Sequence, residues 1–208
     1  MGGCGETHWL PGAKLLFVEV VGVLFQTEQR ERPSMHIRDS RADDLERIQA
    51  IYAHHVLTGT ASFEEVPPSL EELASRRDDV LGRGMPYIVA EMEGRVIGYA
   101  YAGPYRLRTA YRYTVEDSIY LDPDCMGRGA GRALLSVVID RCAEAGCRQM
   151  VAVIGGNGNA ASIGLHRSLG FEPAGLLKAV GFKFGHWVDS VLMQRPLGYG
   201  DTAPPDGY

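Results

Sequence analysis

The sequence predicts a single α/β domain in which helices flank a mixed sheet. Segments whose apolar residues recur every three or four positions indicate amphipathic helices, and short runs rich in β-branched and aromatic residues indicate strands. Along the chain these segments follow the order β-α-α-β-β-β-α-β-α-β-β. A length of 208 residues fits one domain, and a hydrophobic content of 45% is sufficient for a core.

The first half of the domain is predicted to contain two helices and a hairpin. Ser69 with Glu72 three residues later forms a capping-box pattern, which marks the start of the second helix. Two β-like runs flank Glu93-Gly94, so we expect a tight turn between them. The expected elements are a strand from residue 37, helices over 42–56 and 70–81, and strands over 87–91 and 96–102.

The second half is predicted to alternate strands with helices. The run MVAVI is apolar throughout, which is typical of a buried strand. Gly170 directly follows the last periodic residue of a helix, where a glycine commonly ends the helix. The expected elements are a strand over 114–121, a helix over 129–145, a strand over 149–154, a helix over 159–169 and two strands between 174 and 194.

The two ends of the chain do not follow this pattern. Residues 1–34 end in a charged, turn-like patch, and we expect them to form an N-terminal extension that is flexible or adds one strand. Residues 198–208 are rich in glycine and proline and are expected to fray. The predicted domain therefore covers residues 35–197.

Charge and cysteine content argue against several classes of protein. The net charge of −5 disfavours a broad nucleic-acid-binding face. The longest apolar run, residues 15–25, is interrupted by Glu19 and is shorter than the ~20 residues of a membrane span. The four cysteines form no CxxC pair and have no zinc spacing with histidine. We therefore expect a cytoplasmic protein with reduced thiols and no metal.

The densest cluster of glycines lies between a predicted strand and the helix that follows it. Small residues let successive backbone N–H groups point outward, and the helix N-terminus adds positive dipole character, so the segment predicts a pyrophosphate site. It matches neither the Walker A motif nor the dinucleotide fingerprint, and a tight loop with two solvated arginines remains the alternative. The residues concerned are Gly127, Arg128, Gly129, Gly131 and Arg132.

A series of segments in a fixed order is typical of one enzyme superfamily. The segments are IRDSRADDLERIQAIYAHHV, YAGPYRLRTAYRYTVEDSIYL, MGRGAGRALL, GNAASIGLHRSLGF and GFKFGHWVD. They resemble the GNAT superfamily of acetyl-CoA-dependent N-acetyltransferases, and within it the phosphinothricin and related amino-acid N-acetyltransferases. The resemblance implies the GNAT fold, a mixed and mostly antiparallel sheet that is splayed at the acetyl-CoA site and flanked by helices. It also implies acetyl-CoA as co-substrate and a homodimer.

The strand over residues 114–121 carries the candidate base, Glu116. Alternation places Thr114, Glu116, Ser118 and Tyr120 on one face of this strand. By pattern alone, a solvated glutamate on a half-buried strand is the simpler interpretation. The resemblance implies instead that Glu116 takes a proton from a substrate amine, which attacks acetyl-CoA directly without an acyl-enzyme.

The resemblance also assigns residues to the cofactor. The strand is expected to diverge from its neighbour after Glu116, so that its backbone pairs with the pantetheine arm and the Leu121 N–H donates to the thioester oxygen. Met126 stands where the superfamily usually has Gln or Arg, which removes a polar side chain but no backbone donor. The expected cofactor-binding residues are Ile119, Tyr120, Leu121, Gly127, Arg128, Gly129, Ala130, Gly131, Arg132, Asn159 and Ser162.

Asn159, Ser162 and His166 share one face of a predicted helix, because they recur at three- and four-residue spacing. The resemblance implies that Asn159 contacts the cofactor. It also implies that His166, where many superfamily members have Tyr, protonates the leaving thiolate or relays the amine proton. The alternative is that the His166 ring packs the helix against the sheet.

Substrate-binding residues are expected in loops. Arg106, Arg108 and Tyr111 precede the strand of Glu116, and arginine can hold a carboxylate or phosphinate through two hydrogen bonds. Such loop residues are usually solvated, but the resemblance implies a substrate pocket, with Phe63 as an apolar wall. It suggests phosphinothricin, methionine sulfoximine and methionine sulfone as substrates. Acetylation of another small amine and a non-catalytic acyl-CoA-binding module remain as alternatives.

Overall fold

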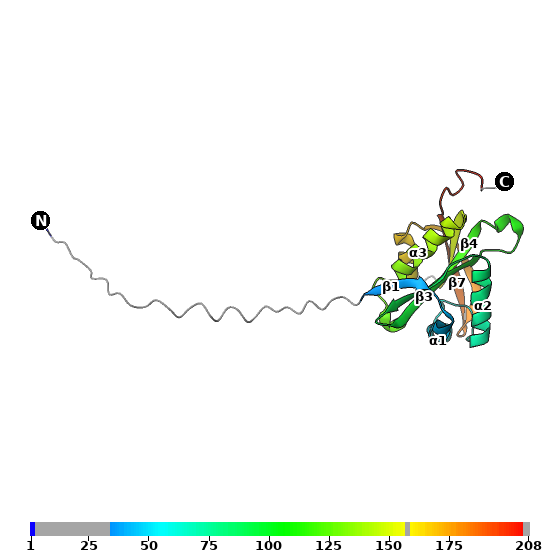
Figure 1. Cartoon of the computed structure of the whole chain (residues 1–208), viewed down its shortest axis with the longest axis horizontal. Coiled ribbons are helices and arrows are strands. Elements are labelled where there is room, and N and C mark those ends of the chain that lie inside the picture. The colour runs from blue at the N-terminus through cyan, green and yellow to red at the C-terminus, as the bar shows by residue number, and fades with distance from the viewer. Residues whose placement is uncertain (3–33, 157–158, 206–208) are drawn as a thin grey trace. The chain divides into compact units, whose positions relative to one another are not determined.

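A computed structural model of the chain describes residues 1–2, 34–156 and 159–205 (Figure 1). The chain divides into two units, Met1–Arg32 and Pro33–Tyr208. The predicted N-terminal extension lies almost entirely outside the described residues, as do the last three residues of the predicted tail. The elements below all belong to the second unit.

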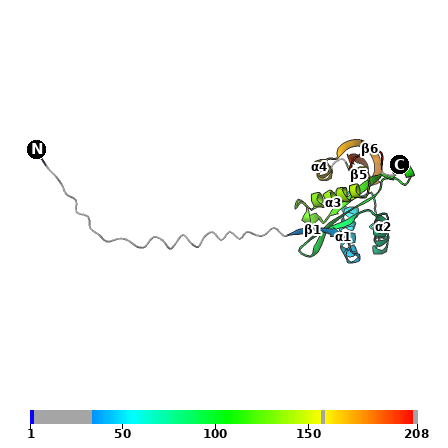
Figure 2. The same cartoon turned by 45° about the horizontal axis from the view of Figure 1, so that its top comes forward.

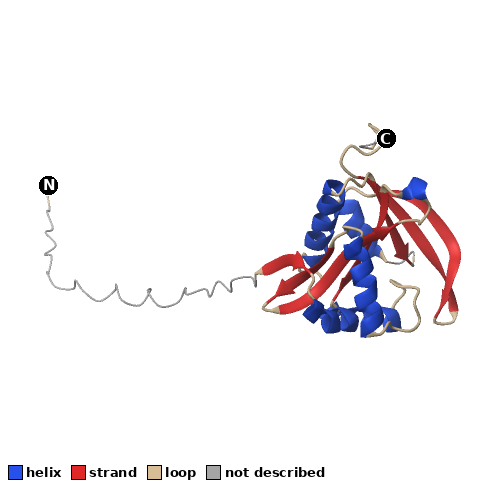
Figure 3. Cartoon of the chain, turned by 45° about the vertical axis from the view of Figure 1, so that its right-hand side comes forward, coloured by secondary structure: helices blue, strands red, loops and turns tan. Residues whose placement is uncertain are grey.

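In the described part of the chain, seven strands form one sheet, drawn in red in Figure 3. They lie in the order β1-β2-β3-β4-β5-β7-β6, and neighbours are antiparallel except for the parallel pair β4 and β5. This confirms the predicted mixed, mostly antiparallel sheet. The strands are β1 (Met35–Asp39), β2 (Tyr87–Met92), β3 (Arg95–Pro104), β4 (Thr114–Leu121), β5 (Gln149–Gly155), β6 (Glu172–Lys183) and β7 (His186–Pro196).

Helices cover both faces of this sheet (Figure 2). The buried residues of α1 and α2 pack with Val89 and Tyr99, whereas those of α3 pack with Ile88, Ala100 and Met150 of the other face. Because successive side chains of β2 point to opposite faces, this strand contributes to the hydrophobic cores on both sides of the sheet. The helices are α1 (Leu45–Thr58), α2 (Leu70–Gly82), α3 (Ala130–Glu144) and α4 (Ala160–Ser168), with short 3-10 turns over Ala42–Asp44, Thr109–Tyr111 and Pro123–Cys125.

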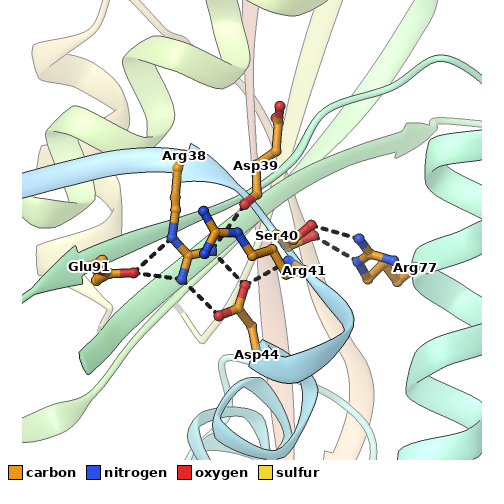
Figure 4. Close-up of polar contacts among 7 residues, drawn as sticks. All are labelled: Arg38, Asp39, Ser40, Arg41, Asp44, Arg77 and Glu91. Atoms are coloured by element: carbon orange, nitrogen blue, oxygen red, sulfur yellow. Dashed lines mark hydrogen bonds and ion pairs between the residues drawn. The ribbon is translucent and has the colours of Figure 1, made fainter. Parts of the chain in front are cut away.

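An ion-pair cluster fixes the entry into α1 (Figure 4). Arg38 on β1 donates to both carboxylate oxygens of Asp44, at 2.7 and 2.8 Å, and to Glu91 on β2 at 2.7 Å. Arg77 on α2 donates to the hydroxyl and carbonyl oxygens of Ser40, at 2.8 and 2.6 Å. Burial would raise the pKa of Asp44, but the hydrogen bonds from Arg38 and from the Arg41 backbone, together with the charges of both arginines, outweigh burial and lower that pKa. The cluster therefore joins β1, β2 and α2 at one corner of the domain.

The parallel pair is short, and this opens the sheet. The ladder between β4 and β5 runs from the pair Thr114–Gln149 to the pair Asp117–Ala152, although β4 continues to Leu121 and β5 to Gly155. On its other side β4 stays paired with β3 as far as Leu121. The strands therefore diverge after Asp117, as expected for the GNAT fold.

None of the helices among the described residues has the length and apolar character needed to cross a bilayer.

Candidate active site

A cleft of about 770 Å³ lies where β4 and β5 diverge. Its walls come from both strands, from the glycine loop before α3, from the first turns of α4 and from the loop around Phe63. Segments that are far apart in the sequence meet here. The volume falls within the range of about 300–1,000 Å³ that is usual for ligand pockets.

Most of the residues predicted to form the site line this cleft, and a smaller group does not. Arg128 and Ala130 of the glycine loop lie outside its wall, as do three residues of the β3–β4 loop, Arg106, Arg108 and Tyr111. The predicted residues that line it are Phe63, Glu116, Ile119, Tyr120, Leu121, Gly127, Gly129, Gly131, Arg132, Asn159, Ser162 and His166.

The glycine loop has the geometry of an anion site. Gly127 and Gly129 have φ angles of 74° and 87°, which residues with a side chain rarely adopt. Gly129 is also the N-cap of α3, and no side chain of the described residues caps this helix. The first backbone N–H groups of α3 therefore remain for a ligand at the positive end of the helix dipole. A diphosphate fits this arrangement.

Asp122 holds the start of the glycine loop. Its buried carboxylate accepts hydrogen bonds from Arg47 on α1, from Arg95 on β3 at 2.7 Å, and from the backbone N–H of Asp124 at 3.1 Å. Because these donors come from separate elements, the loop is anchored to both α1 and β3. The sequence analysis assigned no role to Asp122.

The side chains beside the loop have partners in the protein. Arg132 donates to the carbonyl and hydroxyl oxygens of Ser168, at 3.1 and 2.9 Å, and so links α3 to the end of α4. Arg128 is exposed and lies 3.5 Å from the carbonyl oxygen of Asp124. Met126 is exposed and lines the cleft.

The free edge of β4 forms one wall of the cleft. Beyond Asp117 this strand is paired with β3 but no longer with β5, which leaves backbone groups of residues 119–121 facing the opening. His55 on α1 contacts the carbonyl oxygen of Leu121, with its Nε2 at 2.7 Å. Burial lowers the pKa of His55. His55 also lines the cleft, although the sequence analysis did not single it out.

Glu116 lies near the end of the paired part of β4, one residue before the last β4–β5 pair. It is half-buried on β4, opposite Gly103 of β3 and Val151 of β5. Burial raises the pKa of Glu116, the negative charge of Asp117 raises it further, and Arg106 opposes both. A carboxylate whose pKa is raised in this way is suited to accept a proton near neutral pH.

Asp117 is a second carboxylate in the cleft wall, and the sequence analysis missed it. Its Oδ2 lies 3.0 Å from Nε2 of His166, and both side chains are 3% exposed. Nδ1 of His166 lies 2.8 Å from the carbonyl oxygen of Ser162, and the ring contacts Phe171 edge-on at 4.9 Å. Burial would lower the pKa of His166, but the hydrogen bond and charge of Asp117, together with the hydrogen bond to the Ser162 backbone, outweigh burial and raise it. The sequence did contain a signal for Asp117. It lies between Val115 and Ile119 on an otherwise apolar face of the strand, and a carboxylate there requires a buried partner.

The first turn of α4 holds the other two predicted residues of this helix. Asn159 is the N-cap, and its side-chain oxygen accepts the N–H of Ser162 at 3.2 Å. The Ser162 hydroxyl lies 3.4 Å from Nδ1 of His166. Both residues line the cleft, so the face predicted from their spacing does point toward it.

Phe63 is positioned by a buried lysine and a glycine. Nζ of Lys183 on β6 donates to the carbonyl oxygens of Gly59 and Ser62, at 2.8 and 2.6 Å. A side chain at Gly181 would approach the Phe63 ring to 2.4 Å, so glycine leaves the space for this ring. Burial lowers the pKa of Lys183. Phe63 is thereby held in the cleft wall, as the predicted apolar wall requires.

Arg106, Arg108 and Tyr111 lie on the exposed loop between β3 and β4. The Arg106 guanidinium stacks on the ring of Tyr105 at 4.3 Å, and Tyr111 packs edge-on against the same ring at 5.8 Å. Arg108 begins a 3-10 turn. Arg106 is close enough to Glu116 for its charge to lower the pKa of that carboxyl. The loop thus brings the charge of Arg106 within range of Glu116.

The described residues contain no group of three or more His, Cys, Asp or Glu side chains that could hold a metal ion. Cys125, Cys142 and Cys147 are buried free thiols.

A mostly antiparallel sheet that opens at one parallel pair, with an uncapped glycine-led helix beside the opening, defines an acyl-CoA-dependent transferase. The family described as Acetyltransferase (GNAT) domain matches residues 37–192. The chain therefore belongs to the GNAT acetyltransferase family, and it is an acetyl-CoA-dependent N-acetyltransferase.

Relatives with a known activity cover almost the whole domain. A phosphinothricin N-acetyltransferase of Alcaligenes faecalis is 58% identical over 170 residues, which are 82% of this chain and 86% of that protein. An L-methionine sulfoximine/L-methionine sulfone acetyltransferase of Pseudomonas aeruginosa is 43% identical over 172 residues, covering 82% and 99%. A GNAT superfamily phosphinothricin acetyltransferase from Sinorhizobium meliloti, solved in complex with AcCoA, has a TM-score of 0.81 at 53% identity, covering 83% and 94%.

Proposed function

We propose that this enzyme transfers the acetyl group of acetyl-CoA to the α-amino group of an amino acid or analogue of the phosphinothricin or methionine sulfoximine type. The observation that carries the proposal is Glu116, a half-buried carboxylate with a raised pKa at the point where the cleft opens. The 58% identity to a phosphinothricin N-acetyltransferase supports the substrate class.

Two parts of the chain would bind the cofactor. The backbone N–H groups at the start of α3, after Gly129, would hold the pyrophosphate. The free edge of β4 over residues 119–121 would pair with the pantetheine arm as an added strand would. Acetyl-CoA supplies the activated acetyl thioester, and the Leu121 N–H would donate to its carbonyl oxygen.

Glu116 would act as the base. A substrate ammonium that loses a proton to this carboxylate, directly or through water, gains the lone pair that direct attack requires. The product is the N-acetyl amino acid: the sulfur leaves with the electron pair of its bond to the acetyl carbon, and the second proton lost by the nitrogen neutralises this thiolate. Arg106 lies close enough to Glu116 to influence its charge, and the arginines of the β3–β4 loop would hold the anionic groups of the substrate. Phe63 would form the apolar wall.

A coupled assay of free thiol release over a panel of amines tests the function. We expect release with phosphinothricin, methionine sulfoximine or methionine sulfone. Glu116→Gln should lower kcat/KM at pH 7 by about 100-fold or more, because the amide cannot accept the proton. A wild-type value of kcat/KM in this variant would show that Glu116 is not the base.

The same panel separates the alternatives. Release with a polyamine or another small amine, and not with amino acids, would favour a different substrate class. Tight acetyl-CoA binding without thiol release from any amine would instead favour a binding module.

A further inference from the structure

Asp122 lies between the two segments that would bind the cofactor. It directly follows Leu121, the last residue of the free β4 edge, and it precedes Gly127 of the glycine loop. Its backbone N–H donates to the carbonyl oxygen of Ile97 on β3 at 2.8 Å, so Asp122 is itself fixed to the sheet. This residue therefore connects an ordered strand to the loop that would present its N–H groups to a diphosphate.

The side chain and the carbonyl group of Asp122 shape the turn that follows β4. Its Oδ1 accepts the N–H of Asp124 at 3.1 Å, and its carbonyl oxygen accepts the N–H of Cys125 at 2.9 Å. The Cys125 side chain is buried in the core that includes α3. Gly127 and Gly129 beyond this turn are conformationally permissive, so the path of the loop depends on a fixed starting point.

Two arginines from outside the loop hold the same carboxylate. Its Oδ2 accepts from Arg47 on α1 and from Arg95 on β3, the latter at 2.7 Å. Arg47 also donates to the carbonyl oxygen of Val96 at 3.1 Å, which fixes its direction. The Asp122 side chain is 4% exposed, and the two arginine side chains are 31% and 57% exposed. Two guanidinium groups and one carboxylate leave one net positive charge, so the cluster attracts a diphosphate instead of repelling it.

We propose that Asp122 is a positioning residue for acetyl-CoA: its carboxylate holds the turn after β4 against Arg47 and Arg95, so that the glycine loop is ordered before the diphosphate binds. The proposal rests on the proposed function, since it concerns the loop that would hold the pyrophosphate. Asp122 is not part of the cleft wall, so it acts through the loop and not by contact with the cofactor. Order that exists before binding lowers the entropy cost of binding. Asp122 therefore favours acetyl-CoA over S-acetyl-pantetheine, a shorter thioester that lacks the diphosphate.

Asp122→Asn tests this role. The asparagine has nearly the same size and can still accept the Asp124 N–H, but its amide nitrogen cannot accept from a guanidinium group. The Kd for CoA, measured by titration calorimetry, should rise about fivefold or more, because the loop loses contacts that order it. At saturating acetyl-CoA, kcat should stay within about twofold of the wild type, and kcat/KM with S-acetyl-pantetheine should not change.

Asp44→Asn is the matched control. Asp44 is a buried carboxylate that accepts from Arg38 at 2.7 Å and from the backbone N–H of Arg41 at 2.6 Å, and it lies outside the cleft wall. The control loses the same kind of contact at a distant turn and should bind CoA like the wild type. A rise in Kd as large as that of Asp122→Asn would contradict a specific role of Asp122.

An unchanged Kd for CoA in a folded Asp122→Asn protein would overturn the proposal. Equal losses of kcat/KM with acetyl-CoA and S-acetyl-pantetheine would also overturn it, because a general structural defect affects both thioesters. If Asp122→Asn does not fold, Arg95→Gln removes one of the contacts at a side chain that is 57% exposed, and its Kd for CoA decides in the same way. If no amine is acetylated, the proposed function fails, while the CoA titrations still decide the role of Asp122.

Discussion

At the scale of single residues, Glu116 and Asp117 are consecutive on β4 and point to opposite faces of the sheet. Glu116 projects with Ser118 and Tyr120, whereas Asp117 is buried among the residues that face α3 and α4. Alternation along the strand predicted the position of Glu116. The contact between Asp117 and His166 could not be predicted in the same way, because it joins residues 49 positions apart through the packing of α4 on the sheet.

Gly129 is a further residue at which conformation determines binding. At its φ of 87° an added side chain is strained, so Gly129→Ala should lower the free energy of unfolding by about 1–2 kcal/mol. It should also raise the KM for acetyl-CoA by disturbing the N–H groups of α3. Thermal unfolding and steady-state kinetics measure the two effects. Gly164→Ala on α4 is the control, because its side chain meets no atom within 4 Å and should leave stability equal or higher.

At the scale of elements, local signals predicted most strand and helix starts closely, and the first helix is an exception. β4 covers the predicted residues 114–121, because alternation and the following Asp122-Pro123 are both local features. The first helix was predicted from residue 42, but residues Ala42–Asp44 form a 3-10 turn and α1 begins at Leu45. Arg38 explains the difference, since it holds Asp44 from β1, and that contact is not visible in helical periodicity.

Lys183 links two elements, β6 and the loop that carries Phe63. Lys183→Met should leave the carbonyl oxygens of Gly59 and Ser62 without their donor and lower the free energy of unfolding by about 1–3 kcal/mol. The freed loop should also raise the KM for the amine more than that for acetyl-CoA. Denaturant unfolding and two-substrate kinetics test this. An equal rise in both KM values would contradict a selective role in placing Phe63.

At the scale of the whole molecule, the β6–β7 edge of the sheet exposes many large apolar side chains. The expected homodimer remains a prediction, and this surface is where we place its interface, since patches of this kind mark protein contacts. The boundaries of the predicted domain, 35–197, also remain a prediction, although the family match lies within them. The exposed apolar residues are Leu176, Leu177, Val180, Phe182, Phe184 and Trp187.

The assembly prediction is tested by light scattering after size-exclusion chromatography. We expect a dimer for the wild type and a monomer for the double variant Leu177→Asp/Trp187→Asp, since two buried charges would oppose association. Leu57→Asp, an exposed leucine at the end of α1, is the control and should remain a dimer. A wild-type monomer at micromolar concentration would contradict the prediction.

The short parallel ladder between β4 and β5 has a consequence for folding. On one side of it, β1 to β4 pair in sequence order, and on the other side β5 to β7 form a second antiparallel group. The parallel ladder joins the two groups through the crossover helix α3, and it extends only from the pair Thr114–Gln149 to the pair Asp117–Ala152. Few backbone bonds thus couple the two groups. A ligand held by β4 and by α4 at once adds coupling, so binding should make the two halves unfold more nearly as one cooperative unit.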